Sequence, residues 1–313
     1  MTRLEADNGG SPVLIVGSVA LDTVRTPLGH VEDALGGAAV YSSVAASFFT
    51  PVMVVGVVGE DFPKEHLEFL ASRDIDTRGI QVRPGRSFRW SGSYEYDLNQ
   101  AHTLSTELNV FEHFTPDIPP AYRSAKFVFL ANIDPELQIE VLEQVARPKL
   151  VACDTMNFWI ENKRDVLLDV LKRVDVAFMN DAEARELIGT GSLIKAASEI
   201  RRLGPTTLVI KKGEHGAMMF CGSALCFAAP SYPLEEVVDP TGAGDSFAGG
   251  FIGYLAHTGD TTERNIRRAV IYGSTMASYN VEGFSLDRLR SLTPSDISTR
   301  YNEFKEMVSF EPM

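Results

Sequence analysis

Short runs of β-branched and apolar residues alternate with longer amphipathic stretches along most of this chain. The runs fall at residues 13–16, 52–58, 126–130, 149–153, 174–178 and 207–210. Between them, apolar positions recur with helical spacing at residues 37–48, 62–72, 135–146, 161–173, 181–188 and 193–203. This alternation is typical of βαβ units, in which neighbouring strands are parallel. It predicts an α/β fold with a mostly parallel central sheet flanked by helices.

Ligands of such sheets bind beyond the carboxyl ends of the strands. We therefore expect a functional site among the residues that directly follow the predicted strands. These residues are Gly17, Asn132, Asp154, Asn180 and Lys211.

The segment at residues 81–111 breaks the alternation. Its aromatic residues fall on even positions, which is the period of a strand with one aromatic face. They are Phe88, Trp90, Tyr94 and Tyr96. The aromatic face is interpreted as the packing surface of a small sheet, and alternatively as a hydrophobic cover that closes over a substrate and excludes water.

These patterns predict a core with an inserted lid rather than two tandem domains. Residues 20–34 also have β-like character and are expected to pair with the aromatic segment. The expected division is a flexible tail at 1–11, an α/β core at 12–19, 35–80 and 112–313, and a β lid at 20–34 and 81–111. Near the end of the chain we expect a hairpin between 217–221 and 224–228, followed by two long helices.

Composition narrows the class of protein. The chain has 313 residues, 44% of them hydrophobic and 23% charged, and it contains no run of about 18 apolar residues that could cross a membrane. The N-terminal segment lacks the apolar core of a secretory signal. Three cysteines without paired spacing fit a reducing cytoplasm. A net charge of −13 without a basic stripe argues against a nucleic-acid partner.

The stretch at residues 237–251 carries the strongest functional signal. Gly242, Ala243 and Gly244 leave the backbone bare immediately before a predicted helix that begins at Asp245. Free N–H groups and the positive end of the helix dipole converge there, so this turn is expected to bind an anion. Asp245 lies where its carboxylate can reach a proton beside that anion. A base beside an anion-binding turn indicates phosphoryl transfer.

The same residues allow a structural interpretation. Gly-rich helix starts often serve close packing, and a carboxylate in a first turn is often only a partner of the dipole. Three small residues in succession, however, expose more backbone than packing needs. Asp239-Pro240 also leads stiffly into the turn, which is the preorganisation that binding of developing charge requires. These two features favour the functional interpretation.

Five motifs follow one another along nearly the whole chain. They are Gly17-Ser-Val-Ala-Leu-Asp22, Gly36-Gly37, Asn180-Asp-Ala-Glu183, Lys212-Gly-Glu-His-Gly216 and Asp239-Pro-Thr-Gly-Ala-Gly-Asp-Ser-Phe-x-x-Gly-Phe251. Together, and in this order, they resemble the signature of the ribokinase-like kinases, also called the PfkB carbohydrate kinase family. The resemblance implies a ribokinase-like fold with a lid, and a kinase activity.

The resemblance also implies roles for the anion-binding turn. Asp245 would take the proton from an acceptor hydroxyl as that hydroxyl attacks the γ-phosphoryl group of ATP. The N–H groups of Gly242, Ala243 and Gly244 would stabilise the charge that develops on the transferred group.

On the nucleotide side, the resemblance implies a set of ATP-binding residues: Asn180, Glu183, Gly213, Thr241 and Gly244. Glu183 would hold Mg²⁺ through water, because Mg²⁺ gives up its hydration reluctantly. Asp239 and the carbonyl of Thr241 would form a site for a monovalent cation such as K⁺. Without the other motifs, Asn180 and Glu183 would be interpreted as an ordinary helix cap.

On the acceptor side, the resemblance implies contacts from Asp22, Gly36, Gly37, Tyr41 and Asp245. A turn aspartate bonded to its own backbone, and a flexible turn at the two glycines, are the alternatives for the first three residues. Lys211 and Lys212 are possible phosphate ligands, but successive strand residues point to opposite faces, so at most one can face the site. Neither lysine is included in the predicted site.

Tyr41 departs from the family pattern. Many sugar kinases of the family present an Asn at this position, which binds substrate hydroxyls. A tyrosine offers a ring face and a single hydroxyl, which suits the base of a nucleoside better than a bare polyol. The family resemblance predicts a hydroxymethyl group of a sugar as the acceptor, and Tyr41 supports the alternative, an adenosine-like nucleoside.

Other activities fit the sequence less well. It contains neither the Gly-Lys-[Ser/Thr] motif of a Walker-type NTPase nor a His-Glu-x-x-His zinc motif. Ser246 resembles the nucleophile of a hydrolase elbow, but Asp239-Pro240 breaks the strand which that elbow needs. A ligand-binding protein that keeps the kinase fold without turnover is the non-enzymatic alternative. A homodimer through the lid also stays open, since lid sheets in this family sometimes pair between subunits.

Overall fold

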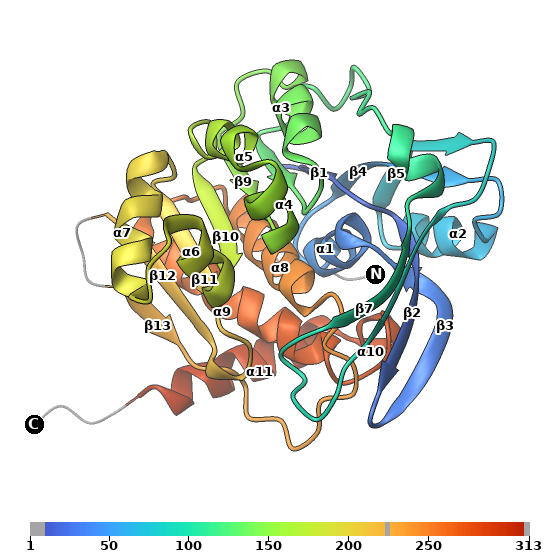
Figure 1. Ribbon diagram of the computed structural model, residues 1–313. Coiled ribbons are helices and arrows are strands. Elements are labelled where there is room, and N and C mark those ends of the chain that lie inside the picture. Colours follow the sequence, from blue (N-terminus) through green and yellow to red (C-terminus); the bar gives the residue numbers. More distant parts are fainter. Residues whose placement is uncertain (1–9, 223–225, 310–313) are drawn as a thin grey trace, which may run out of the picture.

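A nine-stranded sheet forms the centre of the computed structural model, which describes residues 10–222 and 226–309 (Figure 1). Its strand order is β13-β12-β11-β10-β9-β8-β1-β4-β5. The strands are β1 (Val13–Val16), β4 (Val52–Gly59), β5 (Ile75–Arg83), β8 (Phe127–Leu130), β9 (Leu150–Cys153), β10 (Val176–Asn180), β11 (Thr207–Lys211), β12 (Ala217–Cys221) and β13 (Phe227–Ala229). All pairs from β11 to β5 are parallel, and only β12 and β13 are antiparallel to their neighbours. The predicted mostly parallel sheet is confirmed.

Helices cover both faces of this sheet, because its strands are apolar on both faces. Along β1, Val13 and Ile15 pack into one hydrophobic core, and Leu14 and Val16 pack into the other. The first core is covered by α1 (Ala38–Ser47), α2 (Lys64–Ser72), α8 (Ala243–Thr258), α9 (Glu263–Asn280), α10 (Asp287–Ser291) and α11 (Pro294–Met307). The second is covered by α3 (Pro135–Gln144), α4 (Asn157–Asn162), α5 (Arg164–Leu171), α6 (Asp181–Ile188) and α7 (Leu193–Leu203). Two short 3₁₀ helices, η1 (Asn109–His113) and η2 (Gly213–His215), lie in connections.

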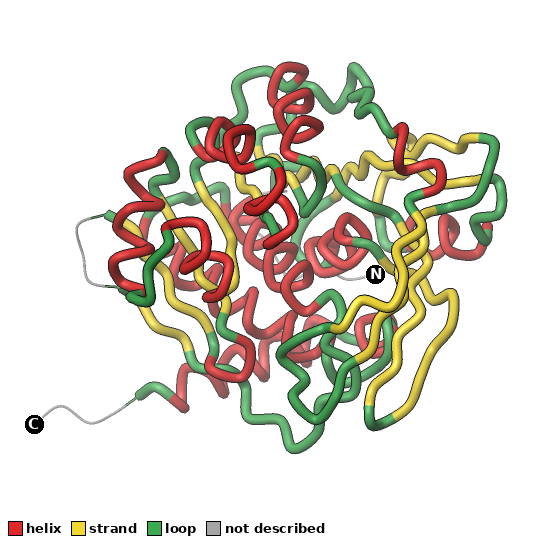
Figure 2. Tube along the Cα trace, in the orientation of Figure 1, coloured by secondary structure: helices red, strands yellow, loops and turns green. Residues whose placement is uncertain are grey.

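A separate four-stranded sheet stands beside the core (Figure 2). Its order is β3-β2-β6-β7, formed by β2 (Ala20–Thr26), β3 (Gly29–Gly36), β6 (Phe88–Ser93) and β7 (His102–Glu107). Strand β2 pairs with β6 in parallel, so the two segments that were expected to pair do so. We call this sheet the lid.

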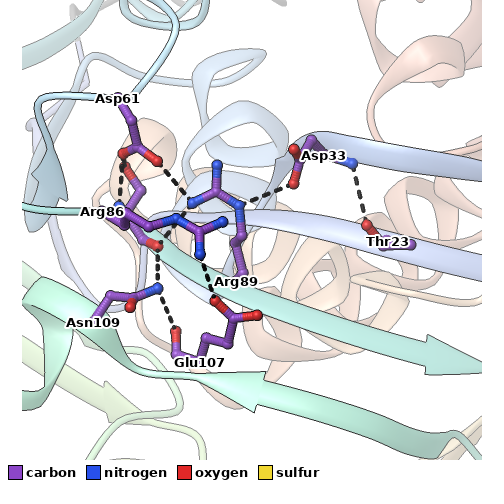
Figure 3. Close-up of polar contacts among 8 residues, drawn as sticks. Thr23, Asp33, Asp61, Arg86, Arg89, Glu107 and Asn109 are labelled. Carbon is purple, nitrogen blue, oxygen red and sulfur yellow. Dashed lines mark hydrogen bonds and ion pairs between the residues drawn. The ribbon is translucent and has the colours of Figure 1, made fainter.

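A polar network at the start of β6 joins the lid to the core, as Figure 3 shows. Arg89 of β6 binds Asp61 of the core at 2.7 Å and Asp33 of β3 at 3.1 Å. The Asp61 carboxylate also accepts hydrogen bonds from the backbone N–H and the hydroxyl of Ser87, both at 2.7 Å. Asn109 donates to the Ser87 carbonyl at 3.0 Å. One core carboxylate therefore holds the base of the lid through charge-assisted hydrogen bonds.

The structure differs from the sequence-based predictions at several boundaries. Residues 81–83 belong to β5 of the main sheet and not to the lid; β5 is a half-polar edge strand, and the apolar pattern did not reveal it. The helix expected at 161–173 is divided into α4 and α5 at Lys163, which leaves the helical region with φ −136° and ψ 36°. The hairpin forms with its second strand at β13.

Parts of three predictions lie outside the described residues: the flexible tail at 1–9, the hairpin turn at 223–225 and the chain end at 310–313. Within the described ranges, none of the helices has the length and apolar character that crossing a membrane requires.

Candidate active site

The turn before α8 has the geometry of an anion site. Gly242 adopts a left-handed conformation with φ 74°, and α8 begins at the next residue. The N–H of Ala243 donates to the Pro240 carbonyl at 3.1 Å. Within the described chain, the N–H groups of Gly242, Gly244 and Asp245 donate to no backbone carbonyl. Of the predicted anion donors, Ala243 is thus engaged, while its neighbours are available to an anion at the positive end of the helix.

Asp245 lies in the first turn of α8 and is partly exposed. No hydrogen bond from another described residue reaches its carboxylate. Burial raises the pKa of Asp245 to about 7, repulsion from Asp154 adds to this effect, and the ammonium of Lys211 opposes it. A carboxylate with unused oxygens and a pKa near neutrality is suited to accept a proton from a substrate.

Asp22 is brought close to Asp245 by the lid. It lies on β2 and is only 5% exposed. Burial raises its pKa to about 7, an N–H from Gly37 opposes this, and Asp239 and Asp245 are close enough to add repulsion. A Cβ atom at Gly36 would lie 1.9 Å from an Asp22 carboxylate oxygen, so only glycine leaves room for this side chain.

Tyr41, whose ring face was expected to suit the base of a nucleoside, packs against the turn before α8. It is 1% exposed, and a Cβ atom at Gly242 would lie 2.3 Å from its ring. The ring therefore packs directly against the anion-binding turn at Gly242. Its hydroxyl has no hydrogen-bond partner among the described residues. Burial raises the pKa of Tyr41 far above its usual value, and Asp22, Asp239 and Asp245 add to the shift, so the phenol stays protonated and can donate.

The lid aromatics do not form one face. Strand β6 ends at Ser93, so Tyr94 and Tyr96 lie beyond it, and Tyr96 is 96% exposed. Phe88 stacks on Phe111 with ring centroids 5.3 Å apart. Trp90 lies against Gly92, where a Cβ atom would meet its ring at 2.2 Å. These contacts favour the packing interpretation for Phe88 and Trp90.

Tyr94 instead connects the lid to the anion-binding turn. The Thr241 hydroxyl donates to the Tyr94 hydroxyl at 3.3 Å. Burial raises the pKa of Tyr94 to about 12, Thr241 opposes the shift, and Asp22, Asp239 and Asp245 contribute to it. A few residues further on, the Asn99 amide lies 3.4 Å from the Glu214 carboxylate. The loop after β6 therefore reaches both the anion-binding turn and the turn at Gly213.

Asn180 and Glu183 form a complete capping box at the start of α6. The Glu183 N–H donates to the Asn180 side chain at 2.8 Å, and the two oxygens of the Glu183 carboxylate accept from the backbone N–H and the amide of Asn180, each at 2.7 Å. The helix cap that the sequence offered as the alternative is therefore present. Metal binding by Glu183 stays a prediction. Burial raises its pKa to about 7, while Lys211 opposes the shift.

No described group of three His, Cys, Asp or Glu side chains is arranged to hold a metal ion directly. Glu183 is 7% exposed, and both of its oxygens already accept hydrogen bonds. Each carboxylate oxygen has a second lone pair, so it can still accept a hydrogen bond from a water molecule. This arrangement fits Mg²⁺ bound through water, because Mg²⁺ keeps several of its own waters.

Asp239 ties the turn to the segment after α9. It is fully buried, and its carboxylate accepts from the N–H of Thr241 at 2.9 Å and from that of Ser285 at 3.2 Å. The carbonyl of Thr241 accepts from the Asn280 amide at 2.7 Å. Both groups proposed for a monovalent cation therefore have partners in the protein. Burial raises the pKa of Asp239, and the hydrogen bonds from Thr241 and Ser285 oppose this.

Lys211 and Asp154 lie at this candidate site, although the set of site residues taken from the family motifs did not include them. The Lys211 ammonium lies 2.6 Å from the Asp154 carboxylate, and a Cβ atom at Gly244 would lie 3.0 Å from it. Lys211 ends β11 and Asp154 directly follows β9, on either side of β10 in the sheet. Both were among the strand-end residues at which the sequence predicted a functional site. Spacing alone did not show which of the two adjacent lysines faces the site.

The hydrolase alternative is excluded by the position of Ser246. This residue is fully buried, and its hydroxyl donates to the Asn280 amide oxygen at 3.0 Å rather than to a histidine. A nucleophile elbow requires an exposed serine paired with a base.

The fold, the lid and an anion-binding turn with an unpartnered carboxylate together define a ribokinase-like kinase. The "pfkB family carbohydrate kinase" model matches residues 13–288, and the chain belongs to this family. It is therefore a carbohydrate or nucleoside kinase, as its motifs predicted.

Known relatives include nucleoside kinases. A cytidine kinase from Thermococcus kodakarensis is 34% identical over 245 residues, covering 77% of this chain and 87% of the relative. The nucleoside kinase structure from Methanocaldococcus jannaschii has a TM-score of 0.74 at 19% identity, covering 95% of this chain and 100% of that one. The aminoimidazole riboside kinase from Salmonella enterica, solved with aminoimidazole riboside and an ATP analogue, has a TM-score of 0.74 at 17% identity, covering 93% and 99%. At these identities the two structures show a shared fold.

The close approach of Tyr41 to Gly242 yields a prediction for stability. Gly242→Ala is expected to lower the free energy of unfolding by about 1–2 kcal/mol for the left-handed alanine and by about 1–3 kcal/mol more for the clash with the ring. Gly259→Ala is the matched control, because Gly259 also has a positive φ of 63°, but a Cβ atom there would have no other atom within 4 Å. Urea denaturation measures both variants.

Tyr41→Ala removes the side-chain atoms beyond Cβ that the added methyl group would meet. In a Tyr41→Ala background, Gly242→Ala is therefore expected to cost less stability than it does in the wild type. Equal destabilisation by Gly242→Ala and Gly259→Ala in the wild type, with the same cost of Gly242→Ala in both backgrounds, would contradict the proposed packing.

Proposed function

We propose that this kinase transfers the γ-phosphoryl group of ATP to the hydroxymethyl group of a nucleoside, with pyrimidine nucleosides such as cytidine as the first candidates. The observation that carries this proposal is the unpartnered Asp245 carboxylate beside the free N–H groups of the anion-binding turn. The sequence favoured a free sugar, with a nucleoside as the alternative. The similarity to a cytidine kinase at 34% identity shifts the preference to the nucleoside.

The proposed reaction is an in-line displacement. The acceptor oxygen forms a bond to the γ-phosphorus as the bond from that phosphorus to the β–γ bridging oxygen breaks, and ADP leaves. The acceptor hydroxyl gives its proton to the Asp245 carboxylate. The N–H groups of Gly242 and Gly244 stabilise the charge on the transferred group, because they point at it from the start of α8 without reorganising.

The acceptor lies between the lid and the turn in this proposal. Asp22 is buried beside Asp245, and its carboxylate can accept two hydroxyl groups, as a ribose ring offers. The buried Tyr41 hydroxyl has no partner among the described residues and can donate to the same acceptor. Tyr94 covers the site from the lid through its contact with Thr241. A closed lid excludes water, which limits hydrolysis of ATP.

The nucleotide lies on the side of α6 and η2 in this proposal, near Asn180, Gly213 and Thr241. Glu183 holds Mg²⁺ through water; when bound, the ion neutralises charge on the phosphate oxygens. Gly213 has φ 54°, and a Cβ atom there would meet the Asn99 side chain at 2.2 Å. Only glycine at position 213 therefore leaves room for the Asn99 side chain of the loop after β6.

Two further sequence-based hypotheses stay predictions. Asp239 and the Thr241 carbonyl are proposed to help bind a monovalent cation such as K⁺, although both already have protein partners. A homodimer is proposed to form through the lid, because β7 is an edge strand that is exposed at every residue and could pair with a second copy.

The activity is tested by ATP turnover with cytidine, uridine, adenosine, inosine and free ribose. We expect turnover to be fastest with a nucleoside, and Asp245→Asn to lower kcat by about 10²–10⁴-fold, which is the usual contribution of a general base. Turnover that survives Asp245→Asn would sink the general-base role. Absence of turnover with every acceptor would favour a ligand-binding protein on the kinase fold.

Asp165→Asn is the matched control, since Asp165 is also a carboxylate in the first turn of a helix, α5. It is expected to leave kcat unchanged.

Thermal melting checks separately whether Asp245→Asn still folds. The pKa of Asp245 is raised from 3.8 to about 7 in the folded protein, so its ionisation destabilises the fold progressively as the pH rises between these two values, and fully above about pH 7. Asp245→Asn is therefore expected to melt no lower than the wild type at pH 8.

The pKa of Asp245 also predicts the pH dependence of the reaction. Only the ionised carboxylate accepts a proton, so kcat/KM is expected to rise with pH and to level off above an apparent pKa near 7. Initial rates with saturating ATP between pH 5.5 and about 9 measure this profile. A rate that is already maximal at the lowest pH would show that no group with a raised pKa must be ionised.

A further inference from the structure

A lysine ammonium lies at the centre of the proposed transfer site without a role assigned so far. Lys211 ends β11, and its ammonium lies 2.6 Å from the Asp154 carboxylate. A Cβ atom at Gly244 would lie 3.0 Å from the same ammonium. The positive charge therefore lies next to Gly244 of the anion-binding turn, on the side where a Cβ atom would project.

Asp154 holds this ammonium rigidly. The Asp154 side chain is 4% exposed, and its other carboxylate oxygen accepts the N–H of Thr155 at 3.0 Å. Its backbone is fixed as well, because the N–H donates to the Leu130 carbonyl at 3.0 Å and the carbonyl accepts from the Gln138 amide at 3.1 Å. Such a partner positions the lysine before any ligand binds, which is the preorganisation that electrostatic catalysis requires.

The surrounding charges keep Lys211 protonated. Burial alone lowers the pKa of a lysine, but attraction from Asp154, Glu183 and Asp245 outweighs burial here, so the pKa of Lys211 rises. The ammonium is thus a permanent charge among carboxylates that follow β9 or lie on α6 and α8. On the opposite side, Asp22, Tyr41 and Tyr94 also face Asp245 from the lid and α1.

We propose that Lys211, positioned by Asp154, is a catalytic residue that binds the transferred phosphoryl group beside the Gly244 N–H. This inference rests on the proposed function for the identity of the transferred group. The equatorial oxygens of that group gain charge in the transition state, and a fixed ammonium in a site with little water stabilises them strongly. The same ammonium favours the ionised form of Asp245, which the reaction needs.

Lys211→Met tests this role, with Lys212→Met as the matched control. Lys212 is the adjacent lysine, and it lies just beyond the end of β11, where η2 begins. We expect Lys211→Met to lower kcat by about 10²–10³-fold, the usual loss for one preorganised donor, and Lys212→Met to leave kcat within about twofold. Lys211→Arg should restore part of kcat, because it keeps the charge.

A pH profile separates this role from a merely structural one. Since Lys211 favours ionised Asp245, Lys211→Met is expected to shift the acid limb of kcat/KM to higher pH. Asp154→Asn should lower kcat as well, because it releases the ammonium. Asp154→Asn also removes a negative charge that repels the ionised Asp245. This variant is therefore not expected to shift the acid limb of kcat/KM to higher pH. A residual activity of Lys211→Met with an unchanged pH profile would point to damaged packing.

Binding measured by calorimetry decides the inference even without turnover. The probes are a non-hydrolysable ATP analogue and ADP, each with Mg²⁺. We expect Lys211→Met to weaken the triphosphate by about tenfold or more and to leave ADP within about twofold, because the ammonium contacts the γ-phosphoryl group. Equal affinities of the Lys211→Met and Lys212→Met variants for both probes would overturn the inference. The wild type could show no turnover with any acceptor while Lys211→Met still loses triphosphate binding selectively. That result would contradict the proposed acceptor and would support the role of Lys211.

Discussion

Desolvation of carboxylates at the carboxyl ends of the strands is the constraint on which the rest of the site depends. Burial raises the pKa of Asp22, Glu183 and Asp245 to about 7 each. Each ionised group needs compensation, and the chain supplies it from N–H groups and from Lys211. Of these three, Asp245 alone receives no hydrogen bond from the described residues, so it is the carboxylate that remains available for a substrate proton.

Glycines make this arrangement of charges possible because the backbone must pass close to buried side chains. Gly36 leaves room for the Asp22 carboxylate, and Gly242 leaves room for the Tyr41 ring. The second contact joins α1 to the turn before α8. In the proposed mechanism, acceptor binding and stabilisation of the phosphoryl group therefore share one packing contact between segments distant in sequence.

The sequence predicted the elements whose physical basis is local. Strands buried on both faces read as continuous apolar runs, whereas the half-polar edge strand β5 did not. The anion-binding turn was found because its small residues and Asp245 are consecutive. The orientation of the Tyr41 ring and the choice of Lys211 over Lys212 depend on packing across the sheet, which spacing does not encode. Tyr94 was recognised as an aromatic, but its contact with Thr241 requires the lid to be placed on the core.

The protonation of Asp245 tests the account most directly. A ¹³C NMR titration of carboxyl-labelled aspartate can be recorded for the wild type and for Asp245→Asn, and the signal that disappears in the variant belongs to Asp245. The account predicts that this signal titrates with a midpoint near 7. A midpoint near the ordinary aspartate value of 3.8 would contradict the proposed desolvated base.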